Sequence, residues 1–121
     1  MGWASKTNIL SDASIDSTDD FSTAVTLNPG EIAHVEVKAK NKTSSSLTDD
    51  CVVSVYSTLD DTSEDWDNTA LFSQTITAST NYIKTSFVVS GIYKFRFGLK
   101  SAGATDDYSA TVNYRKDGVN L

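Results

Sequence analysis

Apolar and polar residues alternate along much of this chain, and the alternation is strictest between residues 32 and 40. The odd-numbered positions of this segment are apolar and would share one face of an extended backbone: Ala33, Val35, Val37 and Ala39. The even-numbered positions are polar or charged: His34, Glu36, Lys38 and Lys40. A period of two is typical of a β-strand with one buried and one solvated face, so we predict such a strand here.

Seven more segments have strand character, with β-branched or aromatic residues in phase and turn-forming residues at their ends. They are residues 5–10, 21–27, 51–58, 70–77, 82–89, 92–100 and 108–114. About eight strands of this kind, with no sustained helical period between them, predict an all-β fold: a two-sheet antiparallel β-sandwich. The pattern leaves two topologies open, a jelly roll and an immunoglobulin-like sandwich.

The segment 51–58 has apolar groups on both faces, which favours a central position in a sheet. Cys51 is the only cysteine, and it is in phase with Val53 and Val55. A free cysteine in such a pattern behaves as a small buried hydrophobe. No disulfide can form within the chain, so stability has to come from packing or assembly.

Length and charge limit the classes of function that are expected for this chain. The chain has 121 residues and a hydrophobic fraction of 39%, which suits one domain with a modest core. We divide it into an N-terminal arm, residues 1–10, and a single β-sandwich domain, residues 11–121. The formal net charge is -6, and the ten Lys and Arg residues form no basic cluster. Nucleic acids and anionic membranes are bound through such clusters, so neither is expected as a partner.

Residues capable of catalysis are scarce. The single histidine, His34, falls on the polar face of its predicted strand, and no motif links it to Cys51. The acidic segment 60–67 has carboxylates that could bind calcium, but it lacks the glycine and terminal glutamate spacing of an EF-hand loop. We therefore expect no enzyme activity, no metal and no cofactor.

Two irregular segments, residues 41–50 and 59–69, are the predicted loops of the sandwich, and loops on a rigid scaffold commonly carry binding function. The second loop contains Trp66. A tryptophan in such a place covers the end of a sandwich core or, when exposed, anchors a partner. Trp3 lies in the predicted arm, which could reach a neighbouring subunit.

Three stretches in about the last 70 residues share a pattern with a known class of proteins. The first is Val-Ser-Val-Tyr-Ser-Thr-Leu-Asp at 53–60, followed by Trp66 and Asp67. The second is Phe-Val-Val-Ser-Gly-Ile-Tyr-Lys-Phe-Arg at 87–96, and the third is Tyr-Arg-Lys-Asp-Gly-Val-Asn-Leu at 114–121. The pattern resembles that of head decoration (cement) proteins of tailed bacteriophages, small structural proteins with a β-sandwich or jelly-roll fold.

The resemblance implies a non-enzymatic virion protein that binds the outer surface of a phage capsid and stabilises it. Its partners would be the major capsid protein and further copies of itself, commonly as a homotrimer. Such a protein would be made in the host cytoplasm and function on the capsid surface of the virion. The arm, the acidic loop and the C-terminal residues supply the candidates for partner contacts: Trp3, Ile9, Leu10, Trp66, Val119 and Leu121.

One alternative remains open, a carbohydrate- or receptor-binding β-sandwich module of a virion appendage. That alternative predicts that Trp66 and tyrosine side chains line up on one exposed face.

Overall fold

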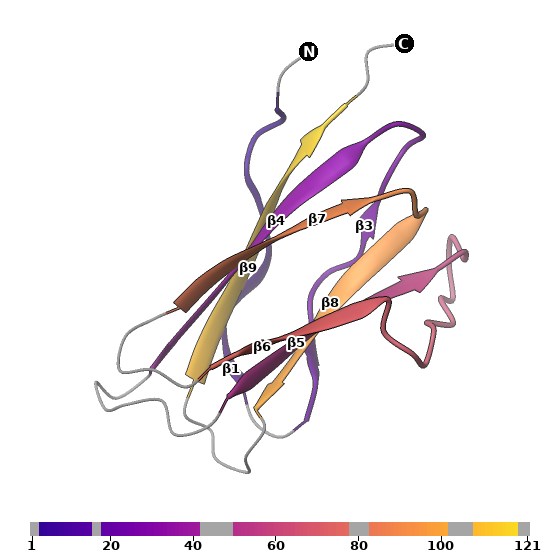
Figure 1. Cartoon of the computed structure of the whole chain (residues 1–121). Coiled ribbons are helices and arrows are strands. Elements are labelled where there is room, and N and C mark those ends of the chain that lie inside the picture. Colours follow the sequence, from indigo (N-terminus) through magenta and orange to yellow (C-terminus); the bar gives the residue numbers. More distant parts are fainter. Residues whose placement is uncertain (1–2, 16–17, 42–49, 78–82, 102–107, 119–121) are drawn as a thin grey trace.

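The computed structural model describes residues 3–15, 18–41, 50–77, 83–101 and 108–118, and regular structure in this part of the chain is β-strand (Figure 1). Its strands are β1 (Thr7–Ile15), β2 (Asp20–Phe21), β3 (Val25–Thr26), β4 (Ile32–Asn41), β5 (Cys51–Thr58), β6 (Phe72–Ile76), β7 (Ile83–Ser90), β8 (Lys94–Ser101) and β9 (Tyr108–Asp117). The predicted all-β class is confirmed. No helix among the described residues is long and apolar enough to cross a membrane.

The strands form two antiparallel sheets. Sheet A has the order β1-β9-β4-β7, and sheet B has the order β2-β8-β5-β6, with β3 also paired to β8. The pairing is nested, because β1 pairs with β9, β2 and β3 with β8, β4 with β7, and β5 with β6. The chain is thus one long antiparallel ribbon, rolled up so that β4 also pairs with β9 and β5 with β8. This strand order is that of a jelly roll, which decides between the two topologies.

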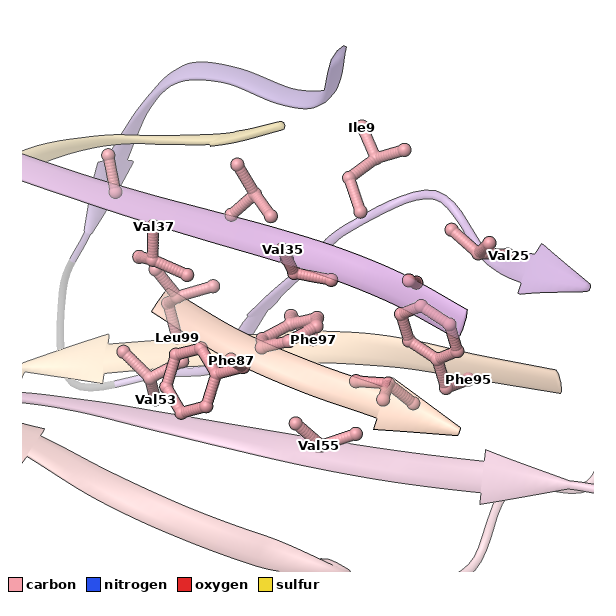
Figure 2. Close-up of a cluster of buried hydrophobic side chains, with 14 of the residues drawn as sticks. Ile9, Val25, Val35, Val37, Val53, Val55, Phe87, Phe95, Phe97 and Leu99 are labelled. Atoms are coloured by element: carbon pink, nitrogen blue, oxygen red, sulfur yellow. The ribbon is translucent and has the colours of Figure 1, made fainter. Parts of the chain in front are cut away.

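The core lies between the two sheets and follows the predicted alternation. The inward face of β4 is fully buried: Ala33, Val35, Val37 and Ala39. Sheet B supplies the opposite wall from β5 and β8: Cys51, Val53, Val55, Phe95, Phe97 and Leu99. Figure 2 shows labelled members of this cluster filling the space between the strands. The Phe97 ring lies 5.3 Å from the Phe87 ring and 5.9 Å from the Phe95 ring, centroid to centroid, so aromatic contacts join both sheets.

The predictions for β5 are confirmed in detail. Its bounds are the predicted ones, and it lies between β8 and β6 inside sheet B. Cys51 is 1% exposed, and this burial raises the pKa of its thiol to about 12. The thiol therefore stays protonated at neutral pH and acts as a hydrophobic side chain, because the thiolate is the reactive form.

The first strand differs from its prediction. It runs from Thr7 to Ile15, so residues 7–10, which we expected in a separate arm, belong to sheet A instead. The pairing of β1 with β9 shifts register between Asn8 and Leu10. At this irregularity, the Ile9 carbonyl oxygen accepts a hydrogen bond from the Thr23 amide at 2.9 Å. A register shift of this kind bends a strand at the edge of a sheet, which here lets β1 also contact the segment between β2 and β3.

The predicted strand 21–27 is two short strands, and Ser22 explains the interruption. The Ser22 amide donates to the Phe97 carbonyl oxygen at 2.8 Å. The Phe97 amide donates to the Ser22 hydroxyl oxygen at 2.9 Å, where a regular ladder would supply a backbone carbonyl. A side chain that replaces a backbone partner ends the ladder locally, and pairing with β8 resumes at β3.

Candidate functional site

Three connecting segments gather at one end of the jelly roll, which we call the loop end. They are the turn 27–31 before β4, the loop 59–71 between β5 and β6, and the turn 91–93 between β7 and β8. They meet because the strands are antiparallel and in register: Ile32 pairs with Ser90, and Thr58 pairs with Lys94. The loop end is at the upper right in Figure 1.

The acidic loop 59–71 is fastened to the sandwich by Lys94, the first residue of β8. The Lys94 side chain is mostly buried, and its ammonium nitrogen donates to Glu64 Oε1 at 2.7 Å and to the Asp61 carbonyl oxygen at 2.9 Å. The neighbouring Tyr93 hydroxyl donates to the Asp61 carboxylate, which raises the pKa of Tyr93. Two adjacent residues, Tyr93 of the turn and Lys94 of β8, therefore connect the loop to the sandwich.

The remaining carboxylates of this loop fold it locally. The Asp65 amide donates to Asp60 Oδ2 at 2.8 Å, and the Thr58 hydroxyl donates to the Asp65 carbonyl oxygen at 3.1 Å. At the far side of the loop, the Ser57 hydroxyl donates to Asp67 Oδ2 at 3.0 Å. Within the described residues, no group of three or more His, Cys, Asp or Glu side chains gathers as metal ligands.

Acidification should loosen this loop. The hydrogen bond from Lys94 is the main cause that lowers the pKa of Glu64 below its ordinary value of 4.5. A carboxyl group whose pKa is lowered by folding stabilises the folded form above its unfolded pKa, and this stabilisation is lost as the pH falls through the folded pKa. We therefore expect the Trp66 fluorescence to be constant at neutral pH and to change as the pH falls below 4.5.

The measurement is a fluorescence titration in a Trp3→Phe background, which leaves Trp66 as the only tryptophan. Glu64→Gln is the control, since it removes the titrating group and keeps a polar side chain of similar size. An acid transition that is identical in this control would contradict the role given to Glu64.

An apolar hollow lies between the two turns of the loop end. Its volume is about 620 Å³, and residues 27–32 and 90–93 line it. A second hollow of about 340 Å³ lies on the other side of the turn 91–93, next to Leu59. Leu59 is 87% exposed, and both Ile32 and Tyr93 are more than one third exposed. We call Ile32, Leu59, Ile92 and Tyr93, with the two hollows, the apolar end surface.

Glycines shape the two turns that line this surface. Gly30 has φ 84° and Gly91 has φ 75°, values in the left-handed region that residues with a Cβ rarely adopt. Gly91 lies on the wall of both hollows, and an added Cβ there would meet no atom within 4 Å. The backbone conformation, rather than crowding, is what requires glycine at this position.

The residues predicted to contact a partner lie in different environments in the structure. Trp3 is 52% exposed and pairs with Asp117 in an isolated β-bridge, with its ring 6.1 Å from the ring of His34. Ile9 lies in the core, and Leu10 packs against the core, so both side chains are used within their own sandwich rather than offered to a partner. Val119 and Leu121 lie outside the described residues.

His34 and Cys51 are kept apart. His34 is exposed on the polar face of β4, as predicted, whereas Cys51 points into the core from β5. The structure therefore does not bring the single histidine to the single cysteine.

Trp66 lies over the outer face of sheet B, and not over the end of the core. The Arg96 guanidinium carbon is 3.7 Å from the centre of the Phe21 ring and 4.6 Å from the centre of the Trp66 ring. Tyr56 meets Phe21 in an edge contact, with 6.0 Å between ring centroids. We call Phe21, Tyr56, Trp66 and Arg96 the Arg96 cluster.

Gly98 makes room for the Arg96 cluster, and this was the signal that sequence reasoning missed. A Cβ at this position would lie 3.0 Å from a Phe21 ring atom and 3.1 Å from a Tyr56 ring atom. Gly98 occupies an outward position of β8, two residues after Arg96, where a side chain would otherwise stand. A glycine inside a strand commonly marks such a close approach.

A smaller hollow of about 250 Å³ opens beside this cluster, and Asp19, Asp67 and Asn68 complete its wall. Burial lowers the pKa of Arg96, although the nearby Glu64 and Asp19 carboxylates act in the opposite direction. The Arg96 Nε–H group is buried and has no hydrogen-bond partner among the described residues. The guanidinium thus lies against the Phe21 and Trp66 rings, while its buried Nε–H has no partner in the part of the chain that the structure describes.

Comparisons with known proteins add little to this description. No known protein family matches the sequence, and a search of curated proteins finds no relative. The chain is similar to a solved structure described as "CBM4 structure and function", with a TM-score of 0.45 and 18% sequence identity. The likeness covers 94% of this chain and 66% of that chain, which is just under two thirds of its length. The jelly-roll assignment rests on the strand pairing.

Proposed function

We propose that this chain is a non-enzymatic structural protein of a bacteriophage virion, which binds the outer surface of the capsid and stabilises it. The proposal starts from the sequence resemblance to head decoration proteins. Parts of all three resembling stretches meet at the loop end: residues 57–60 close β5, residues 90–94 join β7 to β8, and Asp117 ends β9. Segments far apart in the sequence thus contribute to one surface.

The apolar end surface is the observation that carries this proposal. A Leu59 side chain that is 87% exposed gains about 1.5–3 kcal/mol when a partner buries it. The Lys94 and Tyr93 contacts hold the neighbouring loop in place before any partner arrives. A loop ordered in advance loses less conformational entropy on binding, so more of the contact energy appears as affinity. An exposed apolar surface rimmed by acidic groups also suits a protein partner.

Symmetry would strengthen such a contact. Capsid shells present identical sites in rings, and linked copies of a weak contact bind far more tightly than one copy. We therefore propose that the protein occupies the shell as a homotrimer, with the major capsid protein as its principal partner.

The test is co-sedimentation of purified protein with capsids that lack it. Leu59→Asp is expected to weaken binding by at least about tenfold, because it removes an apolar anchor and places a charge in a dry contact. The matched control is Val88→Asp on the outer face of sheet A, where Val88 is 68% exposed. This control should bind like the unchanged protein. Equal binding by both variants, or no binding by the unchanged protein, would contradict the proposal.

A carbohydrate- or receptor-binding module is the second candidate. The specific observation in its favour is the Arg96 cluster, which puts Phe21, Tyr56 and Trp66 together on the outer face of sheet B. The rings of this cluster lie on the outer face of sheet B and Leu59 lies at the loop end, and Asp67 is the residue that lines a hollow of both surfaces.

A further inference from the structure

The hollow beside the Arg96 cluster has an unusual set of polar groups. Arg96 lies on its wall, and the buried Nε–H of this residue has no hydrogen-bond partner among the described residues. Leaving a buried donor unpaired costs about 1–3 kcal/mol, more for a charged group. Arg96 thus brings an incompletely paired guanidinium, a group with five N–H donors in all, to the wall of the hollow.

Two aromatic rings contact the Arg96 guanidinium. The guanidinium carbon lies 3.7 Å from the centre of the Phe21 ring and 4.6 Å from the centre of the Trp66 ring, so contacts with both rings restrict its position. A planar guanidinium held in this way presents a rigid fork of N–H groups at its edge. Because Gly98 lets Phe21 and Tyr56 lie close to β8, the strand backbone in turn supports the rings.

Acceptors and an amide face the same hollow. Asp19, Asp67 and Asn68 line it together with Arg96, and no ion pair joins Arg96 to either carboxylate in the described part of the chain. Asp67 uses Oδ2 to accept from Ser57. The hollow therefore combines separate donors and acceptors that do not neutralise each other directly.

The charges of the side chains around the hollow decide which kind of ligand can bind there. A ligand carboxylate or phosphate would pair with Arg96 but would be repelled by Asp19 and Asp67, in a chain whose net charge is already -6. A ligand cation would be repelled by Arg96. A hydroxyl group both donates and accepts, so neighbouring hydroxyls on a neutral ring can accept from the guanidinium and donate to the carboxylates.

An exposed aromatic ring borders the polar groups of this hollow. Phe21 is 42% exposed, which leaves apolar ring surface next to the polar groups. Binding sites for small ligands commonly combine such apolar surface with a few convergent polar groups, in volumes of about 300–1,000 Å³. At about 250 Å³, this hollow is just below that range, which limits the ligand unit to about one sugar ring.

We infer that the hollow lined by Asp19, Phe21, Tyr56, Trp66, Asp67, Asn68 and Arg96 binds one ring of a neutral saccharide through a pair of adjacent hydroxyl groups. This goes beyond capsid binding and gives the second candidate function a site and a ligand class. A decoration protein with this site would bring the particle into contact with neutral glycans.

The experiment is a nuclear magnetic resonance titration of the ¹⁵N-labelled protein. The probes are glucose, galactose, mannose and N-acetylglucosamine and their short oligomers, with glucuronate and N-acetylneuraminate as acidic counterparts. At least one neutral probe is expected to shift both the Arg96 Nε–Hε and the Trp66 Nε1–Hε1 resonances. Arg96→Lys, which keeps the charge but loses the fork, should weaken this probe's binding by about tenfold.

Two variants keep the result interpretable. Arg115→Lys is the matched control, since Arg115 is exposed on β9 of sheet A and donates to the Ala4 carbonyl oxygen; it should bind like the unchanged protein. Asn68→Ala changes an exposed rim side chain and should also weaken binding, which covers the case that Arg96→Lys does not fold.

The inference is overturned if no neutral probe moves these resonances, if only the acidic probes bind, or if Arg96→Lys and Asn68→Ala both bind unchanged. Capsid co-sedimentation of Arg96→Lys should remain normal. The saccharide site and the capsid proposal can therefore fail independently.

Discussion

Replacing Phe97 with alanine is expected to lower the free energy of unfolding by about 3–5 kcal/mol. Phe97 has 0% exposure and contacts Phe87 of sheet A and Phe95 of its own strand. Its truncation would leave a cavity between the sheets where no side chain can readily collapse. Domains of this size are commonly stable by about 5–15 kcal/mol, so the loss would be a large share of the total.

Urea denaturation followed by circular dichroism measures this effect. Phe21→Ala is the matched control, because it removes the same ring from the outer face of sheet B, where Phe21 is 42% exposed. The control should cost about 1 kcal/mol, mainly from the lost contacts with Arg96 and Tyr56. Equal losses in the two variants would contradict the position of the core between the sheets.

Replacing Lys94 with methionine is expected to release the loop 59–71 while leaving the sandwich folded. Methionine can fill the space of the mostly buried lysine stem, but it cannot donate to Glu64 or to the Asp61 carbonyl oxygen. The amides of Asp65 and Asp67 lie in hydrogen bonds that depend on the folded loop. Their hydrogen exchange should accelerate by at least about tenfold, since local opening would cost at least about 1.4 kcal/mol less.

Hydrogen exchange at single amides and capsid co-sedimentation test this prediction together. Lys84→Met is the control, because Lys84 pairs with Glu36 at 3.5 Å on an exposed surface where such pairs contribute little. If the Lys94 account is correct, only Lys94→Met accelerates exchange in the loop and weakens capsid binding. Unchanged exchange at Asp65 and Asp67 in Lys94→Met would contradict the fastening role of Lys94.

The strands were predictable because their information is local. The alternation in β4 and the bounds of β5 could be predicted from the order of apolar and polar residues, and the structure agrees with both predictions. The split between β2 and β3 could not be predicted, because it depends on the Ser22 hydroxyl meeting Phe97, a residue 75 positions away. The jelly-roll order depends in the same way on long-range pairing, which the period of a strand does not specify.

The same difference between local and long-range information decides how much of the candidate sites could be predicted. The sequence indicated Trp66 and the acidic loop, but not their fastening by Lys94 or the stacking of Trp66 on Arg96. The Arg96 cluster combines residues from β2, β5, β8 and the loop 59–71, which only the order of sheet B brings together. Ile9 and Leu10 were expected at a partner contact because residues 1–10 were assigned to an arm; β1 instead pairs with β9, with Ile9 in the core and Leu10 packed against it.

The most direct test of the central proposal is a cryo-electron microscopy reconstruction of capsids reconstituted with this protein. We expect ordered jelly-roll density on the outer surface, arranged in trimers, with the loop end and Leu59 facing the shell. A capsid without ordered added density, or density in which the loop end points to solvent and another face meets the shell, would contradict the account.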